Sequence, residues 1–240
     1  MTEQYENKLF RECTRRITAA YDTLGHQHGW HFLQTPKRTF STAAPLWFLG
    51  LNPGGRRHQQ TEISVEAGNG YRVGQWGGTD DLKPLQRQVI GLFSEISGHL
   101  GMDRDELMDT SLCSNICPYR SPSWQELPAK AETMRFCRGL WLGITRQLMP
   151  SVVVTIAPQA NRVILDAMTE CGYSVTDQSK LSAGWGTVKC SRIRLQRSNR
   201  KALIIRLPHL SRFGIIGREP SMPTVRKLSE EIAATIGSAQ

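Results

Sequence analysis

The sequence predicts an α/β fold, namely a three-layer α/β/α sandwich around a central, mainly parallel four-stranded sheet. Three observations lead to this fold class. Strand-like and helix-like segments alternate from residue 45 onward, the strand-like runs are short and mostly apolar, and polar residues stand just past several of their ends. Continuous apolar runs are typical of parallel strands that are buried on both faces. The carboxyl ends of such strands are where ligands bind.

The length and composition suit a single domain. The chain has 240 residues, of which 39% are hydrophobic and 21% charged, which is ordinary for a globular protein. No internal repeat or low-complexity run interrupts it. We therefore expect one domain over 1–240, in which an N-terminal helix and loop (1–44) pack on an α/β core (45–240).

The charge balance favours a polyanionic partner. Thirty Lys and Arg residues against 21 Asp and Glu give a net charge of +9, which suits DNA, although many basic proteins bind no nucleic acid. The N-terminus has early acidic residues and no apolar signal-peptide region, and no later apolar run approaches the ~18 residues of a membrane span. We expect a cytoplasmic monomer that binds no membrane, with its six cysteines as thiols.

The N-terminal part predicts a helix followed by a polar loop. Apolar residues recur at steps of three and four over 3–24. His26, His28 and His31 follow closely and could suggest a metal site. No clear fourth ligand and no His-Glu-x-x-His spacing accompany them, so we favour a polar loop without metal.

The stretch 45–55, PLWFLGLNPGG, predicts a buried strand that ends in a rigid, narrow turn. Glycine at such a turn lets a ligand approach the backbone, and Asn52 would face a pocket. The next segment, 56–81, is long, polar and glycine-rich. Connections of this length are usually functional or disordered. Its aromatic residues, Tyr71 and Trp76, favour an ordered lip of the pocket.

The remaining elements follow from apolar periodicity and from Gly and Pro at their ends. Helices are predicted over 82–100, 124–149, 158–171 and 223–236, and strands over 111–118, 151–157 and 202–207, while 188–195 alternates between apolar and polar residues. Asn115 lies in the strand-like run SLCSNICP, and His209 follows ALIIRLP. Asn52, Asn115 and His209 are thus all expected at the carboxyl edge of the sheet.

Several motifs resemble those of the uracil-DNA glycosylase superfamily. GLNPGG (50–55) resembles its first motif, NICPYRSP (115–122) its second strand and following loop, VVVTIAPQANRVI (152–164) its third strand and helix, and PHLSRFG (208–214) its closing His-x-Ser motif. The family usually has Pro where Leu210 stands here. The resemblance spans about 45–237 and is most specific as an ordered set.

The resemblance implies a monofunctional DNA glycosylase. Such an enzyme flips an aberrant or modified pyrimidine out of DNA and hydrolyses its N-glycosidic bond, which leaves an abasic site. Asn52 and His209 would be catalytic: Asn52 would position the attacking water, and His209 would stabilise the anion that develops on the departing base. Asn115 would hydrogen-bond the base edge, and Tyr71 or Trp76 would stack on the ring.

The resemblance also implies the rest of the site and its substrate. The base-binding set is completed by Gly50, Leu51, Pro53 and Gly54. DNA contacts are assigned to Gly55, Arg56, Arg57, Arg120, Ser211, Arg212 and Phe213, with Phe213 or Ile215 as the wedge that fills the vacated stack. Because the strictly uracil-specific branch has Tyr at the position of Gly54, the C5 side of the pyrimidine should be open here. We expect uracil or a 5-substituted pyrimidine, such as modified phage cytosine, as the substrate, in DNA repair or antiviral defence.

Some superfamily members hold an iron-sulfur cluster through four cysteines. Cys117 and Cys137 fall near two of those positions, but the N-terminal Cys-x-x-Cys is absent. We therefore expect no cofactor.

Two other interpretations remain open. One is a DNA-binding protein of the same fold that has lost catalysis. The other is an unrelated α/β enzyme that acts on a small phosphorylated substrate, although the chain has no Walker A motif, no Gly-x-Gly-x-x-Gly fingerprint and no Gly-x-Ser-x-Gly elbow. A purely structural alternative for the three polar residues is that Asn52 caps a turn, Asn115 satisfies backbone groups and His209 is a surface histidine.

Overall fold

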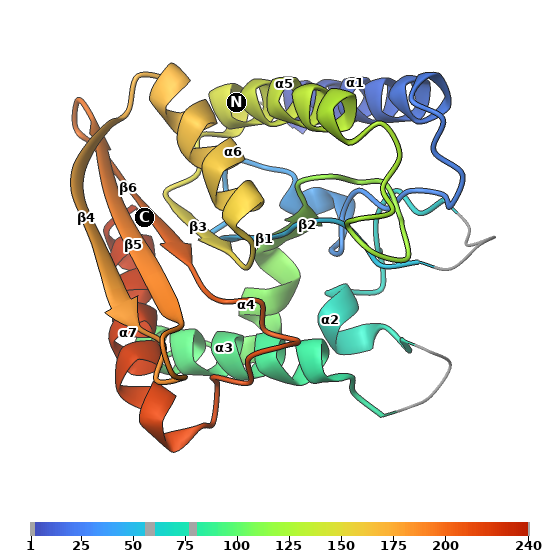
Figure 1. Cartoon of the computed structure of the whole chain (residues 1–240). Coiled ribbons are helices and arrows are strands. Elements are labelled where there is room, and N and C mark those ends of the chain that lie inside the picture. The colour runs from blue at the N-terminus through green and yellow to red at the C-terminus, as the bar shows by residue number, and fades with distance from the viewer. Residues whose placement is uncertain (1–2, 56–60, 77–80, 240) are drawn as a thin grey trace.

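One mixed sheet runs through the computed structural model, which describes residues 3–55, 61–76 and 81–239 (Figure 1). Its strands are β1 (Trp47–Gly50), β2 (Leu112–Asn115), β3 (Val152–Thr155), β4 (Ser174–Ser182), β5 (Lys189–Arg197) and β6 (Arg200–Arg206), and their order is β2-β1-β3-β6-β5-β4. The first four strands in this order are parallel to one another. β5 and β4 are antiparallel additions, so the predicted four-stranded sheet is corrected to a six-stranded mixed one.

The two antiparallel strands have different sequence signals. β5 is joined to β6 by a tight turn at Ser198 and Asn199, where Ser198 has a φ of 51°; a turn this short brings the two strands together as a hairpin. β4 lies at one edge of the sheet, and most of its side chains are exposed and polar. Such an edge discourages pairing with other chains, and it also lacks the apolar alternation by which a strand is predicted.

Helices cover both faces of the sheet, which makes the three layers visible in Figure 1. One face is covered by α1 (Glu3–Thr23), α5 (Lys130–Leu148) and α6 (Pro158–Glu170), and the other by α3 (Pro84–Leu100), α4 (Arg104–Thr110) and α7 (Met222–Ala239). Each face has its own apolar core. In β1, Trp47 and Leu49 belong to the first core and Phe48 to the second, because successive side chains of a strand point to opposite faces. Burial on both sides explains why these short parallel strands are apolar throughout.

Two helices differ from the sequence prediction. α5 begins at Lys130 instead of residue 124, because Pro128 disfavours helix at the preceding residue and Ala129 has a φ of 42°. α4 was not predicted at all. Its N-cap is Asp103, whose side chain accepts a hydrogen bond from the Glu106 backbone N–H. An Asp followed three residues later by Glu is the signal that would have found this helix.

The segment 30–34 lies alongside β2 and the chain that follows it. Isolated bridges join Trp30 to Tyr119 and Leu33 to Ser114, and a third joins His31 to Glu62. This arrangement brings side chains of the N-terminal loop to the carboxyl end of β2. Three short helical turns complete the described structure: α2 (Gly70–Val73), η1 (Lys37–Thr39) and η2 (Glu219–Ser221). Within the described part of the chain, no helix has the length and apolar character needed to cross a membrane.

Candidate functional site

A pocket of about 700 Å³ lies where β1 and β2 end. These neighbouring parallel strands pair Gly50 with Asn115, so the residues that follow them emerge side by side. The predicted site residues that line the pocket are Asn52, Pro53, Gly54, Tyr71, Trp76, Asn115 and Arg120. Gly50 and Leu51 lie behind this lining: the Gly50 and Leu51 carbonyls accept hydrogen bonds from the backbone N–H groups of Ile116 and Cys117.

The side chain of Asn52 is held in one orientation. Its Nδ2 donates to Ser121 Oγ at 2.9 Å and to the Pro53 carbonyl at 3.2 Å. Ser121 is buried and also forms a bridge with Gly54. Because the amide nitrogen is used in these bonds, Oδ1 is left to accept a hydrogen bond from a group inside the pocket.

Asn115 offers a free amide next to it. The residue is 7% exposed, and its side chain makes no hydrogen bond to any residue that the structure describes. The absence of a side chain at position 50 creates its space, because a Cβ there would overlap Asn115 Oδ1. A buried amide that is not paired within the protein is suited to a ligand that brings both a donor and an acceptor.

Aromatic rings form another part of the pocket. Tyr71 is 3% exposed and meets Phe48 edge to face at 5.5 Å, and Trp76 lies 5.2 Å from the Tyr71 ring at an interplanar angle of 60°. Trp76 is partly exposed, so Trp76 has the more accessible face for stacking on a planar ligand.

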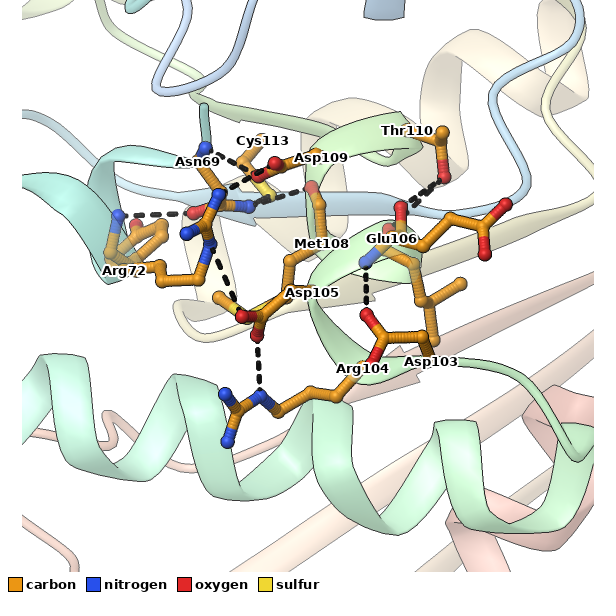
Figure 2. Close-up of polar contacts among 12 residues, drawn as sticks. Asn69, Arg72, Asp103, Arg104, Asp105, Glu106, Met108, Asp109, Thr110 and Cys113 are labelled. Carbon is orange, nitrogen blue, oxygen red and sulfur yellow. Dashed lines mark hydrogen bonds and ion pairs between the residues drawn. The ribbon is translucent and has the colours of Figure 1, made fainter. Parts of the chain in front are cut away.

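A polar network fixes the helix α2 that carries Tyr71 (Figure 2). Asn69 caps this helix by accepting from the Tyr71 N–H, and its Nδ2 donates to the Met108 carbonyl at 2.9 Å. Arg72 Nη2 donates to Asp109 Oδ2 at 2.6 Å, while Asp109 Oδ1 accepts from the Asn69 N–H at 2.8 Å. These bonds tie α2 to the C-terminal end of α4, so the aromatic side of the pocket rests on a rigid support.

His209 lies at the same edge of the sheet but does not line this pocket among the residues described. It follows β6, and β3 separates β6 from β1, which puts the two strand ends about 10 Å apart at the usual strand spacing. Its Nδ1 is 2.8 Å from Ser211 Oγ, and its carbonyl accepts from the backbone N–H groups of Arg212 and Phe213. Burial, with a contribution from the Arg212 charge, lowers the pKa of His209 below its usual value, so the imidazole is neutral at pH 7.

The residues assigned to DNA contacts have different environments. Ser211 and Arg212 are exposed on the His209 turn, whereas Ile215 is fully buried and cannot be the wedge. Phe213 is partly buried, and its ring centroid lies 6.0 Å from that of Trp185, an exposed residue in the β4–β5 turn that the sequence did not indicate. Gly55 is partly exposed; Arg56 and Arg57 lie outside the described residues.

Arg120 points inward and forms part of a polar wall that sequence reasoning did not predict. The polar wall consists of His31, Gln34, Glu62 and Arg120, all of which line the pocket. Arg120 Nη2 donates to Glu62 Oε2 at 2.6 Å, and Arg120 Nη1 donates to the Gly54 carbonyl at 3.1 Å. The Arg120 side chain is only 11% exposed, so it is not available to a phosphate at the surface without breaking these bonds.

His31 is the most buried member of the polar wall that can titrate. Its Nδ1 lies 3.0 Å from Gln34 Nε2 and 3.2 Å from Glu62 Oε2. Burial lowers the pKa of His31 to about 4, against the opposing effect of the Glu62 carboxylate. The ring is therefore neutral at pH 7.

The described residues contain no group of three or more His, Cys, Asp or Glu side chains that could hold a metal ion. All six cysteines are buried and free. Models of known protein families give no match to the chain, and curated proteins include no significantly similar sequence.

Proposed function

We propose that this protein is a monofunctional DNA glycosylase that hydrolyses the N-glycosidic bond of a pyrimidine flipped out of DNA. One observation carries the proposal: Asn52 and Asn115, from the ends of adjacent parallel strands, line a single pocket together with Tyr71 and Trp76. A pocket with two amides and two aromatic rings suits a flat heterocycle whose edge carries donors and acceptors.

In the proposed complex the pyrimidine edge pairs with the Asn115 amide. This amide has no partner among the described residues, so the base would supply the hydrogen bonds that it lacks. Trp76 would stack on the ring. At Gly54 a Cβ would meet no atom of the described residues within 4 Å, which supports an open side of the pocket and a substrate that is uracil or a 5-substituted pyrimidine.

Hydrolysis breaks the bond between the base and C1′ of the sugar, and water adds at C1′. Asn52 Oδ1 would accept a hydrogen bond from this water and orient it, since an amide is too weak a base to deprotonate water fully. The base departs as an anion, and the proton that the added water releases passes to the departed base or to solvent. With Ser211 donating to Nδ1, the neutral His209 would carry its proton on Nε2 and donate it to the pyrimidine O2 as charge develops there.

A DNA-binding protein without hydrolytic activity is the second candidate function. The observation that favours it is the position of His209, which is outside the pocket lining among the described residues. On the glycosylase proposal, the bound nucleotide spans the distance between Asn52 and His209. If the protein only binds DNA, the bound nucleotide does not reach His209. Substitution of Asn52 then has no effect on abasic sites, because none are formed.

The test is base release from defined DNA. The protein is incubated with oligonucleotides that contain uracil, a thymine mismatch, 5-hydroxymethylcytosine or its glucosylated form, and free bases and alkali-sensitive abasic sites are measured. We expect abasic sites in at least one of these DNAs, absent with the Asn52→Ala variant and retained with Asn7→Ala, a control on α1 that does not line the pocket. Binding without abasic sites from any DNA would overturn the glycosylase proposal. The expected DNA partner, monomeric state and cytoplasmic location stay predictions.

A further inference from the structure

The proposed hydrolysis does not use the polar wall, although His31, Gln34, Glu62 and Arg120 line the same pocket. These residues come from three separate parts of the chain. His31 and Gln34 lie in the N-terminal segment 30–34, Glu62 lies between β1 and α2, and Arg120 lies in the loop that follows β2. Gathering these four polar side chains at a pocket costs free energy, because each one loses hydrogen bonds to water. A ligand that pairs with them would offset this cost.

The polar wall is incompletely satisfied by its own contacts. His31 Nε2 and Arg120 Nε are buried, yet neither has a hydrogen-bond partner in the described part of the chain. His31 is 5% exposed and lines the pocket. Its Nδ1 lies near two donors, Gln34 Nε2 at 3.0 Å and Arg120 Nη2 at 3.4 Å, and near the Glu62 carboxylate oxygen at 3.2 Å. In either tautomer Nε2 is a buried polar atom without a partner in the described part of the chain. An unpaired buried polar atom of this kind is destabilising, and a ligand group that pairs with it would restore the missing hydrogen bond.

The charges of the polar wall indicate which kind of ligand it accepts. The Arg120 guanidinium is neutralised by the Glu62 carboxylate at 2.6 Å, and His31 is uncharged because burial lowers its pKa to about 4. An anion would face Glu62, and a cation would face Arg120. A hydroxyl group both donates and accepts, so it matches a surface where a carboxylate, an amide and N–H donors alternate at zero net charge.

The position and size of the pocket indicate where such a hydroxyl would be attached. Arg120 bonds the carbonyl of Gly54, the residue at the open side of the proposed base site, so the polar wall begins where a substituent at C5 would point. The volume of about 700 Å³ falls in the range of pockets that hold drug-sized ligands, roughly 300–1,000 Å³. A pyrimidine ring alone is much smaller than such a ligand.

We propose that the polar wall is a subsite for a neutral, hydroxyl-bearing substituent at C5 of the extruded pyrimidine, with space for a sugar. This inference rests on the proposed base site at Asn115. It assigns His31, Gln34, Glu62 and Arg120 to substrate selection, a role separate from bond cleavage at Asn52 and His209.

The experiment measures binding separately from cleavage. The probes are single-stranded oligonucleotides with one cytosine, 5-hydroxymethylcytosine or glucosylated 5-hydroxymethylcytosine on a 2′-fluoro sugar, which resists hydrolysis because fluorine disfavours positive charge on the sugar. Dissociation constants are compared for the wild type, Glu62→Gln and the matched control Glu66→Gln. Glu66 is an exposed carboxylate that bonds Ser64 and the Lys37 N–H and does not line the pocket.

We expect the wild type to bind both hydroxyl-bearing probes at least tenfold more tightly than cytosine. Glu62→Gln should reduce this ratio about tenfold, and Glu66→Gln should keep it. A larger ratio for the glucosylated probe than for the hydroxymethyl probe indicates that the sugar itself is bound. Equal affinity of the wild type for all three probes, or an unchanged ratio in Glu62→Gln, would overturn the subsite. The readout needs no cleavage, so a protein that prefers these probes but forms no abasic sites would refute the glycosylase proposal and leave the subsite standing.

Discussion

The two ends of the sheet edge that carry the proposed catalytic residues are built differently. At the β1–β2 end, the paired residues Gly50 and Asn115 hold the following chain together, and Asn52 and Asn115 line one pocket. At the β6 end, His209 lies in a tight turn, with β3 between its strand and β1. A polar residue that follows a parallel strand lies at the carboxyl edge of the sheet, whereas the pocket that it lines depends on the order of the strands.

The largest expected effect is at the β1–β2 end. Asn52→Ala should lower base release by roughly 10²- to 10⁴-fold, because the attacking water loses its hydrogen-bond acceptor. Ser121→Ala should cost only about fivefold, since it removes one hydrogen bond of ~1 kcal/mol that orients Asn52. Single-turnover kinetics and DNA binding at low salt are measured for both variants. Equal losses in the two variants, or lost binding in Asn52→Ala, would contradict the assigned role.

The same pair of measurements at the β6 end should give losses of base release in the same order, with a smaller loss for the catalytic residue. His209→Ala should lower base release by roughly 10²- to 10³-fold, the usual effect of removing a donor to a developing anion. Ser211→Ala should cost about fivefold, because it loses one hydrogen bond to His209 Nδ1. Base release is compared with binding to the same DNA. Full activity of His209→Ala would mean that the β6 end takes no part in the reaction.

Glycine substitutions compare the packing of the two ends. Gly50→Ala should lower the free energy of unfolding by about 1–3 kcal/mol, because its Cβ would overlap Asn115 Oδ1. Gly214→Ala, in the chain after His209, should change it by less than about 0.5 kcal/mol, since the nearest atom to its Cβ would be Gln88 Nε2 at 3.7 Å. Urea unfolding measures both. Equal stability of the two variants would show that Asn115 moves freely away from position 50.

Acid pH should lower the free energy of unfolding through protonation of His31, which lies at the β1–β2 end. Its pKa of about 4 in the folded protein is below the ordinary value of about 6.5, so the unfolded chain binds more protons between these values. The contribution of the neutral His31 to stability is therefore fully present above pH 6.5 and is lost as the pH falls toward 4. His31→Gln should remove up to about 1.4 kcal/mol per pH unit of this slope. Urea unfolding at pH 7, 6 and 5 measures the slope, and an unchanged slope in the variant would contradict the burial of a neutral His31.

The sequence predicts some parts of this molecule well and others hardly at all. The four parallel strands were predicted because burial on both faces makes them apolar, as in VVVT of β3. β4 was missed because its side chains are mostly exposed. The strand order, which separates His209 from Asn52, is a tertiary property that no local pattern contains.

The site shows the same division. Asn52, Asn115, Tyr71 and Trp76 were predicted because motif and strand ends indicate them, and they line one pocket. The sequence predicts that His31 belongs to a polar loop, and it gives no signal for Glu62. Both come from irregular segments that are brought together by tertiary contacts, namely the bridge between them and neighbouring backbone hydrogen bonds, so no periodicity could connect them.

The most direct test of the account is a crystal structure of the protein with DNA that carries a 2′-fluoro pyrimidine nucleotide. The account predicts that the base is flipped into the pocket against Asn115 and Trp76, with Asn52 and His209 on opposite sides of the bond between sugar and base. A base that stays stacked in the DNA, or a His209 that remains away from that bond, would contradict it.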